Sequence, residues 1–520
     1  MKPLRIIIIG SGLGGLAVGI RLAADGHKVR IIEKNSVPGG AAGRIDINGF
    51  RFDTGPSIIT APFLLTQLFE YAGKKLDDYI KLQELDPIFS AVFPEALTPD
   101  IHFPENKVYQ NKEYLFYREP AAAMFHNNIF SAAEQKAFHD FEMASDQMMK
   151  PVFMDYCSQE PAPNPFPLFS RSKIQNLQPN ITLEQSVNHW FRSAEMADWP
   201  SYIALKELFK FWPILAGCNP AEGSHLFRIM PSILHEWSAF APVGGMGILT
   251  EALVKLFWEC GGEIALNSEV QAVQVFNHNA TGIRLKDGSL QQADVIISDA
   301  DVFSTFQNLI DSDKTKYSDV ENSKNQTAGL GMFIYHMGLK QKLEEKIPLL
   351  ANNVIFPLNY QNYIEDIFHK KVFPNDPFMI LRIPDRIDEK AVPHGCESIS
   401  VLVPVPNLQT DLHWNHKSYF YREKVIDSVQ KLFDTDLRTN LVIEKFEDPL
   451  MVRQKSNILW GNSFGISPEI NKHGGKFFSH RFSDIHNLYM VGAGTHPGPF
   501  IPGVLMGASI TAQMIIDDNS

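Results

Sequence analysis

The sequence predicts an α/β fold in which a Rossmann-like domain is joined to a discontinuous α+β domain. A strand–glycine turn–helix–strand unit opens the chain at residues 4–33, and a strand–glycine loop–helix unit closes it at residues 487–517. The long stretches 107–234 and 326–475 contain no motif of this kind. A chain of 520 residues also exceeds what one hydrophobic core usually organises, so we expect two domains.

The first unit has the pattern of a dinucleotide-binding motif. The apolar run Leu4–Ile9 predicts a buried parallel strand, and a helix with regularly spaced apolar residues is predicted to end near Gly26. The turn between them is Gly10-Ser11-Gly12-Leu13-Gly14-Gly15. In such a turn the first glycine permits the bend, the second lets the backbone approach a pyrophosphate, and the third lets helix and strand pack closely. The helix N-terminus would stabilise the phosphate charge. A purely structural glycine turn is the alternative, which the complete context disfavours.

Residues after this turn extend the predicted binding site. The second strand, Lys28–Glu33, ends in an acid at the place where a ribose hydroxyl would be bound, and Lys34 follows it. Gly39 and Gly40 would let the backbone pass close to a second part of a long cofactor. A further short strand leads into the turn Gly55-Pro56-Ser57.

The C-terminus has the matching half of the site. Asn487–Val491 is a predicted strand, Gly492 and Gly494 lie in the loop after it, and a helix opens with Ile501-Pro502-Gly503-Val504. The N-terminus of that helix could stabilise the electron-rich end of a reduced flavin ring. A cofactor contacted by both chain ends suits extended FAD. The sequence has no second G-x-G-x-x-G for NAD(P)H, so oxygen or a quinone is the expected electron acceptor.

Composition excludes several classes of function. With 47 Lys+Arg against 59 Asp+Glu, the formal charge of −12 does not suit nucleic-acid binding, although a local patch could still contact a membrane surface. The 4 cysteines are far apart, so we predict no redox dithiol and no metal site, and we expect the cytoplasm. We interpret the first apolar run as a strand rather than a signal peptide. No apolar stretch reaches the roughly 20 residues of a membrane-spanning helix.

Together these motifs resemble the carotenoid (phytoene) desaturase family, a branch of the FAD-dependent amine-oxidase-like (GR2) flavoproteins. Besides the turns above, the resemblance rests on Phe52–Ser57, Pro242–Gly247, Val491–Gly498 and Ile501–Val504. It implies an FAD-binding domain of residues 1–106, 235–325 and 476–520. A substrate and membrane-associating domain would then comprise residues 107–234 and 326–475.

The resemblance also implies that the backbone of Val270 touches the adenine, although the sequence alone suits a purely structural strand equally well. Three places depart from the family pattern. Ala41 stands where an Arg is frequent, Pro499-Phe500 stands where small residues are usual, and Gly507 stands where a Ser is common. Because Phe500 would lie near the flavin, the shape of the substrate site is expected to differ there.

The implied activity is desaturation, in which a long polyene loses a hydride to flavin N5 and a proton from the neighbouring carbon. We predict no catalytic side chain: His496 could bond the ring, relay a proton or only shape its loop. Carotenoid oxygenases, isomerases and retinol saturases on the same scaffold are alternatives. A non-catalytic prenyl-lipid carrier is an alternative of another class.

The segments outside the glycine motifs are rich in aromatic residues, notably Phe209–Trp212 and Tyr360–Phe368. These residues suit either an apolar tunnel for a polyene or an ordinary core. One predicted helical face could lie on a bilayer or be buried, and it comprises Tyr202, Leu205, Phe209 and Trp212. Because a polyene dissolves in lipid, we expect peripheral membrane association.

Overall fold

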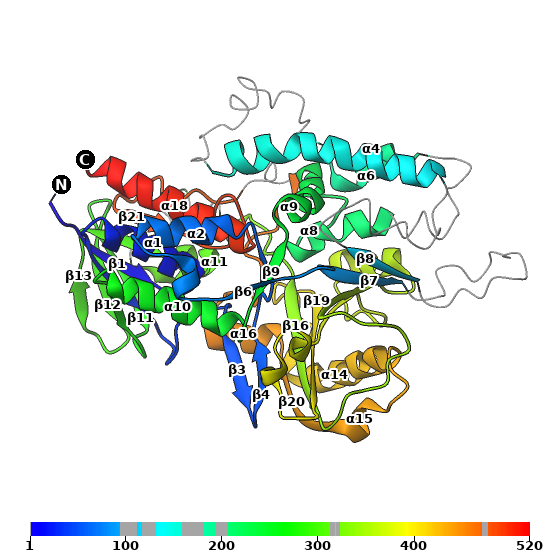
Figure 1. Ribbon diagram of the computed structural model, residues 1–520. Helices are drawn as coiled ribbons and strands as arrows, with labels where there is room; N and C mark the ends of the chain where they lie inside the picture. The colour runs from blue at the N-terminus through cyan, green and yellow to red at the C-terminus, as the bar shows by residue number, and fades with distance from the viewer. Residues whose placement is uncertain are drawn as a thin grey trace, which may run out of the picture.

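The computed structural model describes residues 2–93, 112–116, 132–158, 181–192, 206–311, 318, 323–470 and 477–520. Two large sheets dominate this part of the chain, each covered by helices (Figure 1). Smaller strand groups lie between and beside them. They are the pair β3 (Arg44–Ile47) and β4 (Phe50–Asp53), and the trio β5 (Ile59–Thr60), β9 (Ala239–Pro242) and β6 (Leu82–Glu84).

The first large sheet is parallel and holds the glycine motifs. Its strand order is β10-β2-β1-β14-β21, and every neighbouring pair runs in the same direction. The strands are β1 (Arg5–Ile9), β2 (Lys28–Ile32), β10 (Glu263–Ala265), β14 (Val295–Ser298) and β21 (Leu488–Met490). From β1 the chain moves to one side through β2, while β14 pairs on the other side. This is the Rossmann-like arrangement, and the predicted fold class is confirmed.

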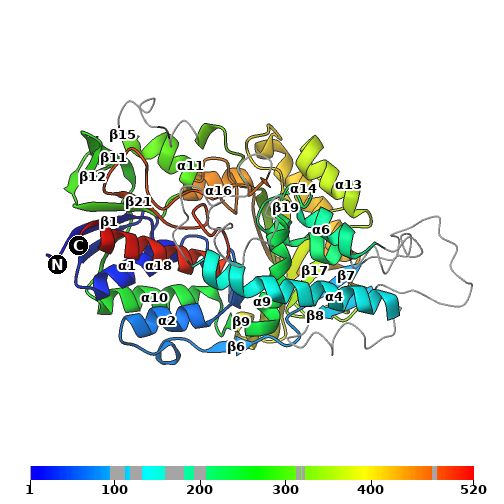
Figure 2. The same cartoon turned by 90° about the horizontal axis from the view of Figure 1, so that it is seen from above.

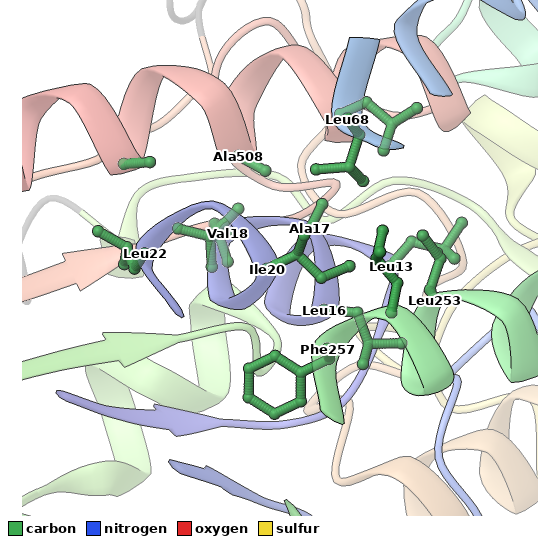
Figure 3. Close-up of a cluster of buried hydrophobic side chains, with 14 of the residues drawn as sticks. Leu13, Leu16, Ala17, Val18, Ile20, Leu22, Leu68, Leu253, Phe257 and Ala508 are labelled. Carbon is green, nitrogen blue, oxygen red and sulfur yellow. The ribbon is translucent and has the colours of Figure 1, made fainter. Parts of the chain in front are cut away.

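Four helices cover one face of this sheet: α1 (Leu13–Ala24), α2 (Phe63–Tyr71), α10 (Met246–Glu259) and α18 (Ile501–Asp518). Figure 3 shows Leu16 and Ile20 of α1 between Phe257 of α10 and Ala508 of α18, and all four side chains are buried. Burying one such large apolar side chain stabilises the fold by about 1.5–3 kcal/mol. The first and last helices of the chain are therefore packed together, and the two termini lie close to each other (Figures 1 and 2).

A small sheet covers the opposite face through Val270, Val273 and Ile283, which share a core with Ile7 and Ile9 of β1. Its order is β13-β12-β11-β15, with β11 (Val270–Phe276), β12 (Asn279–Leu285), β13 (Leu290–Gln292) and β15 (Ile310–Asp311). A turn at Asp287-Gly288 joins the antiparallel strands β12 and β13, and the Gly288 N–H donates to the Leu285 carbonyl there.

The second large sheet has the order β20-β16-β19-β18-β17-β7-β8. Helix α14 (Trp414–Gln430) packs on one face, and α4 (Ala132–Met149), α6 (Leu183–Trp190), α8 (Trp212–Leu215), α9 (Met230–Trp237) and α13 (Tyr360–Ile364) gather on the other. The strands are β20 (Leu441–Glu447), β16 (Gly331–Leu339), β19 (Glu397–Val405), β18 (Met379–Arg382), β17 (Asn352–Ile355), β7 (Phe89–Phe93) and β8 (Lys112–Phe116).

The structure differs from the predicted segment boundaries in two places. Strand β7 falls in the first predicted segment, 1–106, yet it pairs with β17 and β8 of the second sheet. The boundary at 234/235 falls inside α9. Both differences arise from pairing and packing partners far away in the sequence, which local patterns do not reveal.

The predicted aromatic segments meet in one buried cluster. Phe209, Phe211, Trp212, Tyr360 and Tyr363 all belong to it, and each is at most 6% exposed. The bilayer-facing interpretation is therefore wrong for Phe209 and Trp212, which pack inside, while Tyr202 and Leu205 lie outside the described residues. Among the described helices, none combines the length and the apolarity needed to cross a bilayer.

Candidate functional site

The candidate site lies at the carboxyl edge of the parallel sheet. Because the strands are parallel, the residues that follow them emerge at one edge: Gly10 after β1, Glu33 after β2, Asp299 after β14 and Val491 after β21. The chain leaves β1 and β14 toward opposite sides. Ligands of open α/β sheets bind in the crevice at such a switch point.

The first glycine turn is held by close backbone contacts. Gly10 has a φ of +96°, which favours glycine. A Cβ atom on Gly15 would lie 2.5 Å from the Gly10 carbonyl oxygen, so helix α1 approaches β1 as closely as backbone allows. Helix α1 starts after Gly12, which has no side chain to cap it, and the N–H groups of Gly12 and Gly15 face the Asp299 carboxylate. The N-terminus of α1 therefore attracts an anionic group.

Glu33 is buried and tied to the turn. Its Oε2 accepts hydrogen bonds from the Ser11 N–H at 3.0 Å and from Ser11 Oγ at 2.6 Å, and its Oε1 accepts from the Asn35 N–H at 2.8 Å. Lys34 points toward Asn457, with Nζ 2.8 Å from Oδ1. Burial lowers the pKa of Lys34, and the nearby Glu269 carboxylate opposes that shift.

The second glycine pair lies directly on the first turn. The Gly39 N–H donates to the Ser11 carbonyl at 2.9 Å, and a Cβ atom on Gly40 would lie 3.1 Å from the Gly12 Cα. Gly39 has a φ of +117°, and a Cβ atom on it would lie 2.7 Å from Cγ2 of Thr250 in α10. The two glycine loops therefore lie against each other, and a contact of Gly39 or Gly40 with a cofactor stays a prediction.

The C-terminal loop reaches the same place. A Cβ atom on Gly14 would lie 3.2 Å from both the N and the Cα of Gly492, so the two chain ends touch through glycines. Gly494 lies against Val302, and Gly503 against the Gly498 carbonyl oxygen. Pro502 and Val504 follow Ile501 in the first turn of α18, and Ile501 shares a core with Leu13. The predicted convergence of the two ends is confirmed.

Val270 and His496 have positions that suit structural roles. Val270 begins β11 and is linked to the Glu33 side of the site, since the Ser268 N–H donates to the Glu33 carbonyl. His496 is 3% exposed, its N–H donates to the Phe478 carbonyl, and its own carbonyl lies against Gly507 of α18. A contact of either residue with a cofactor stays a prediction.

A cavity lined by both apolar and polar residues lies where the turn Gly55-Pro56-Ser57 faces the second large sheet. Its lining includes Asp53, Ser57, Asn352 and Arg382. The Arg382 guanidinium donates to the Gly55 carbonyl, and Ser57 Oγ lies 3.5 Å from Asn352 Oδ1. Burial raises the pKa of Asp53, while the Met246 N–H and Arg382 oppose that shift. Burial lowers the pKa of Arg382 to about 10.

Three residues of the site were missed by the sequence reasoning: Asp299, Arg382 and Asn352. Asp299 directly follows the apolar run of β14, so the rule that ligands bind at the carboxyl ends of parallel strands could have found it. Arg382 and Asn352 reach the site from β18 and β17 through long-range packing, for which the sequence holds no local signal.

The residues present fit an extended dinucleotide such as FAD. The two glycine loops and Gly492 approach one another without side chains of their own, and a Cβ atom on Gly12, Gly14 or Gly492 would crowd the Asp299 carboxylate, which reaches this space. The acid that would bind a ribose stands at the end of β2, and the uncapped N-terminus of α1 suits phosphate. In the described part of the chain, no three His, Cys, Asp or Glu side chains are grouped to hold a metal.

Comparisons with known proteins agree with this geometry. A family model described as an NAD(P)-binding Rossmann-like domain matches residues 8–72. The chain is 29% identical to a lycopene-forming phytoene desaturase of Pseudescherichia vulneris, with 99% of each chain covered. It is 28% identical to a 4,4'-diapophytoene desaturase of Staphylococcus haemolyticus, again over 99% of each chain, and 26% identical to a 4,4'-diaponeurosporene oxygenase of the same species, over 99% and 97%.

Solved structures share the fold. A triple variant of putrescine oxidase superposes with a TM-score of 0.65 at 13% identity, covering 99% of both chains. An oxidoreductase from Methanosarcina mazei gives a TM-score of 0.60 at 15% identity, covering 98% of this chain and 99% of its own. The resemblance to the carotenoid desaturases and to the amine-oxidase-like fold is therefore confirmed.

Proposed function

We propose that this chain is an FAD-dependent oxidoreductase that desaturates a long polyene of the carotenoid type, acting on CH–CH bonds. Two observations together support this proposal. The chain matches phytoene and diapophytoene desaturases from end to end, and its two ends meet through the glycines Gly14 and Gly492.

In this proposal the residues of the protein bind the FAD, orient the polyene and shield the flavin ring. Bound FAD would supply the acceptor for the hydride. The loops at Gly10–Gly15 and Gly39–Gly40 would hold the phosphates, Glu33 the ribose, and the N-terminus of α18 the electron-rich end of the ring. The substrate loses a hydride and a proton from neighbouring carbons. Because conjugation stabilises the allylic cation that forms, a dedicated strong base is not required.

The test is co-expression with carotenoid precursors, followed by pigment identification. We expect phytoene or diapophytoene to gain conjugated double bonds and the purified chain to be yellow with stoichiometric FAD. A Gly15→Ala chain serves as the inactive control. Oxygenated products from diaponeurosporene would favour the oxygenase alternative, since a relative carries that name. A purified chain that is colourless and takes up no FAD would contradict the proposal and favour a lipid carrier.

The same proposal covers the electron acceptor of the reduced flavin and the binding of the protein to a membrane surface. A substrate that dissolves in lipid must be met there, so we propose peripheral association with a bilayer and an electron acceptor that is oxygen or a quinone. We expect the chain to float with carotenoid-loaded liposomes in a density gradient. A chain that stays entirely at the bottom of the gradient, with and without substrate, would contradict membrane association.

A further inference from the structure

Asp299 places a carboxylate inside the glycine-lined crevice. It directly follows β14, on the side of the switch point opposite β2. A Cβ atom built on Gly12 would lie 2.6 Å from Asp299 Oδ2, and one on Gly14 would lie 2.6 Å from Oδ1. A Cβ atom on Gly492 would lie 3.0 Å from the same Oδ1. The carboxylate therefore touches all three backbone segments that form the predicted phosphate site.

The surroundings of Asp299 favour its neutral form. Its Oδ2 is shielded from solvent and makes no hydrogen bond of standard geometry with the described residues. Burial raises the pKa of Asp299 well above its usual value, the N–H groups of Gly15 and Gly12 oppose that shift, and the charge of Glu33 adds to it. The glycine turn and the Gly492 loop bring backbone atoms against it. Among the described residues, Glu33 is the ionisable side chain that acts on its pKa, and no cation does so.

From this geometry, and resting on the proposed function, we infer that Asp299 couples FAD binding to proton uptake. A pyrophosphate bound at the uncapped N-terminus of α1 carries two negative charges next to this carboxylate. Like charges in a site of low dielectric repel strongly, so the nucleotide binds when Asp299 carries a proton taken from solvent. The affinity for FAD then falls as pH rises, and Asp299 acts as a residue that sets the charge of the site.

The test measures FAD binding to the full-length apoprotein between pH 6 and 9, by quenching of flavin fluorescence. For the wild type we expect the Kd to rise with pH, by up to about tenfold per pH unit above the pKa of Asp299 in the apoprotein. Asn keeps the size and an acceptor oxygen but cannot ionise. Asp299→Asn should therefore bind FAD more tightly than the wild type at pH 9, with a Kd that is nearly independent of pH.

Calorimetry in two buffers of different ionisation enthalpy gives a second readout. At a pH where the Kd of the wild type rises, Asp299 of the apoprotein is ionised, so we expect up to one proton taken up per FAD there and close to none in Asp299→Asn. Asp301→Asn is the matched control, because Asp301 is also shielded but caps the Ser304 N–H at 2.9 Å instead of facing the glycines. It should keep the wild-type pH dependence.

The outcomes separate this inference from the proposed function. If FAD binds with the same pH dependence in the wild type and Asp299→Asn, or if the wild type takes up no proton, the inference is overturned while the function stands. If neither chain binds FAD at any pH, the proposed function itself is contradicted.

Discussion

Replacing Gly15 with alanine is expected to weaken FAD binding by at least about 100-fold and to destabilise the first domain by about 3 kcal/mol. The added Cβ would lie 2.5 Å from the Gly10 carbonyl oxygen and 2.9 Å from Asp299 Oδ2. The clash cannot be relieved by a shift of the turn alone or of helix α1 alone, because both are fixed to β1. Overpacking of a tight core contact typically costs about 1–3 kcal/mol. A new atom that meets backbone is at the upper end of this range, because backbone moves less easily than a side chain. Flavin fluorescence titration and thermal unfolding measure the two effects.

Gly329→Ala is the matched control for this substitution. Gly329 also lies in a tight backbone region, but its Cβ would have 3.4 Å to the nearest atom, the Gly465 carbonyl oxygen, which is an ordinary contact. Its FAD affinity and thermal midpoint should stay close to those of the wild type. A Gly15→Ala chain that binds FAD within about threefold of the wild type would show that helix α1 need not approach β1 so closely for the cofactor to bind.

The sequence could predict those parts of the fold whose defining residues are close together along the chain. The apolar run before Gly10, the helix after it and the acid at Glu33 are neighbours in sequence, so periodicity and spacing identify the Rossmann-like unit. The C-terminal loop and helix could be assigned to the same site because a glycine loop between a strand and a helix has few other uses. The structure confirms that Gly14 and Gly492 touch.

The second sheet could not be predicted in the same way. Strand β7 joins it because Phe89, Ala91 and Phe93 pack into the aromatic cluster while Val92 packs on the other face. That alternation fits any half-buried strand and does not identify the partner β17. Phe209 and Trp212 likewise have spacing that suits either a bilayer or a core. The rings that pack on them decide between the two: Phe138 and Phe141 on Phe209, and Phe89 on Trp212.

Replacing Arg382 with methionine is expected to destabilise the protein by about 3 kcal/mol and to weaken FAD binding. Arg382 connects the second sheet to the first domain, since it donates to the Gly55 carbonyl and lies near the Asp53 carboxylate. Methionine fills a similar volume but has no donor and no charge. Removing one partner of a buried pair commonly costs about 3–5 kcal/mol, because the other group stays buried without compensation.

Urea unfolding measures the change in stability, with Arg51→Met as the control. Arg51 lines the same cavity and also lowers the pKa of Asp53, but less than Arg382 does, and it pairs with Asp388 at 3.1 Å and with Asp46 at 3.5 Å. Its loss should therefore cost less stability than the loss of Arg382.

The pH dependence distinguishes loss of charge compensation at Asp53 from loss of packing. Burial already raises the pKa of Asp53, so its folded form is most stable when protonated, and that stability declines as pH rises through the raised pKa. Without Arg382 the pKa of Asp53 rises further, so Arg382→Met should lose more stability at pH 8 than at pH 5. Adding Asp53→Asn removes the uncompensated charge and should recover part of the loss at pH 8 and little at pH 5. A loss that is equal at both pH values and unchanged by Asp53→Asn would mean that Arg382 acts through packing and its bond to Gly55 alone.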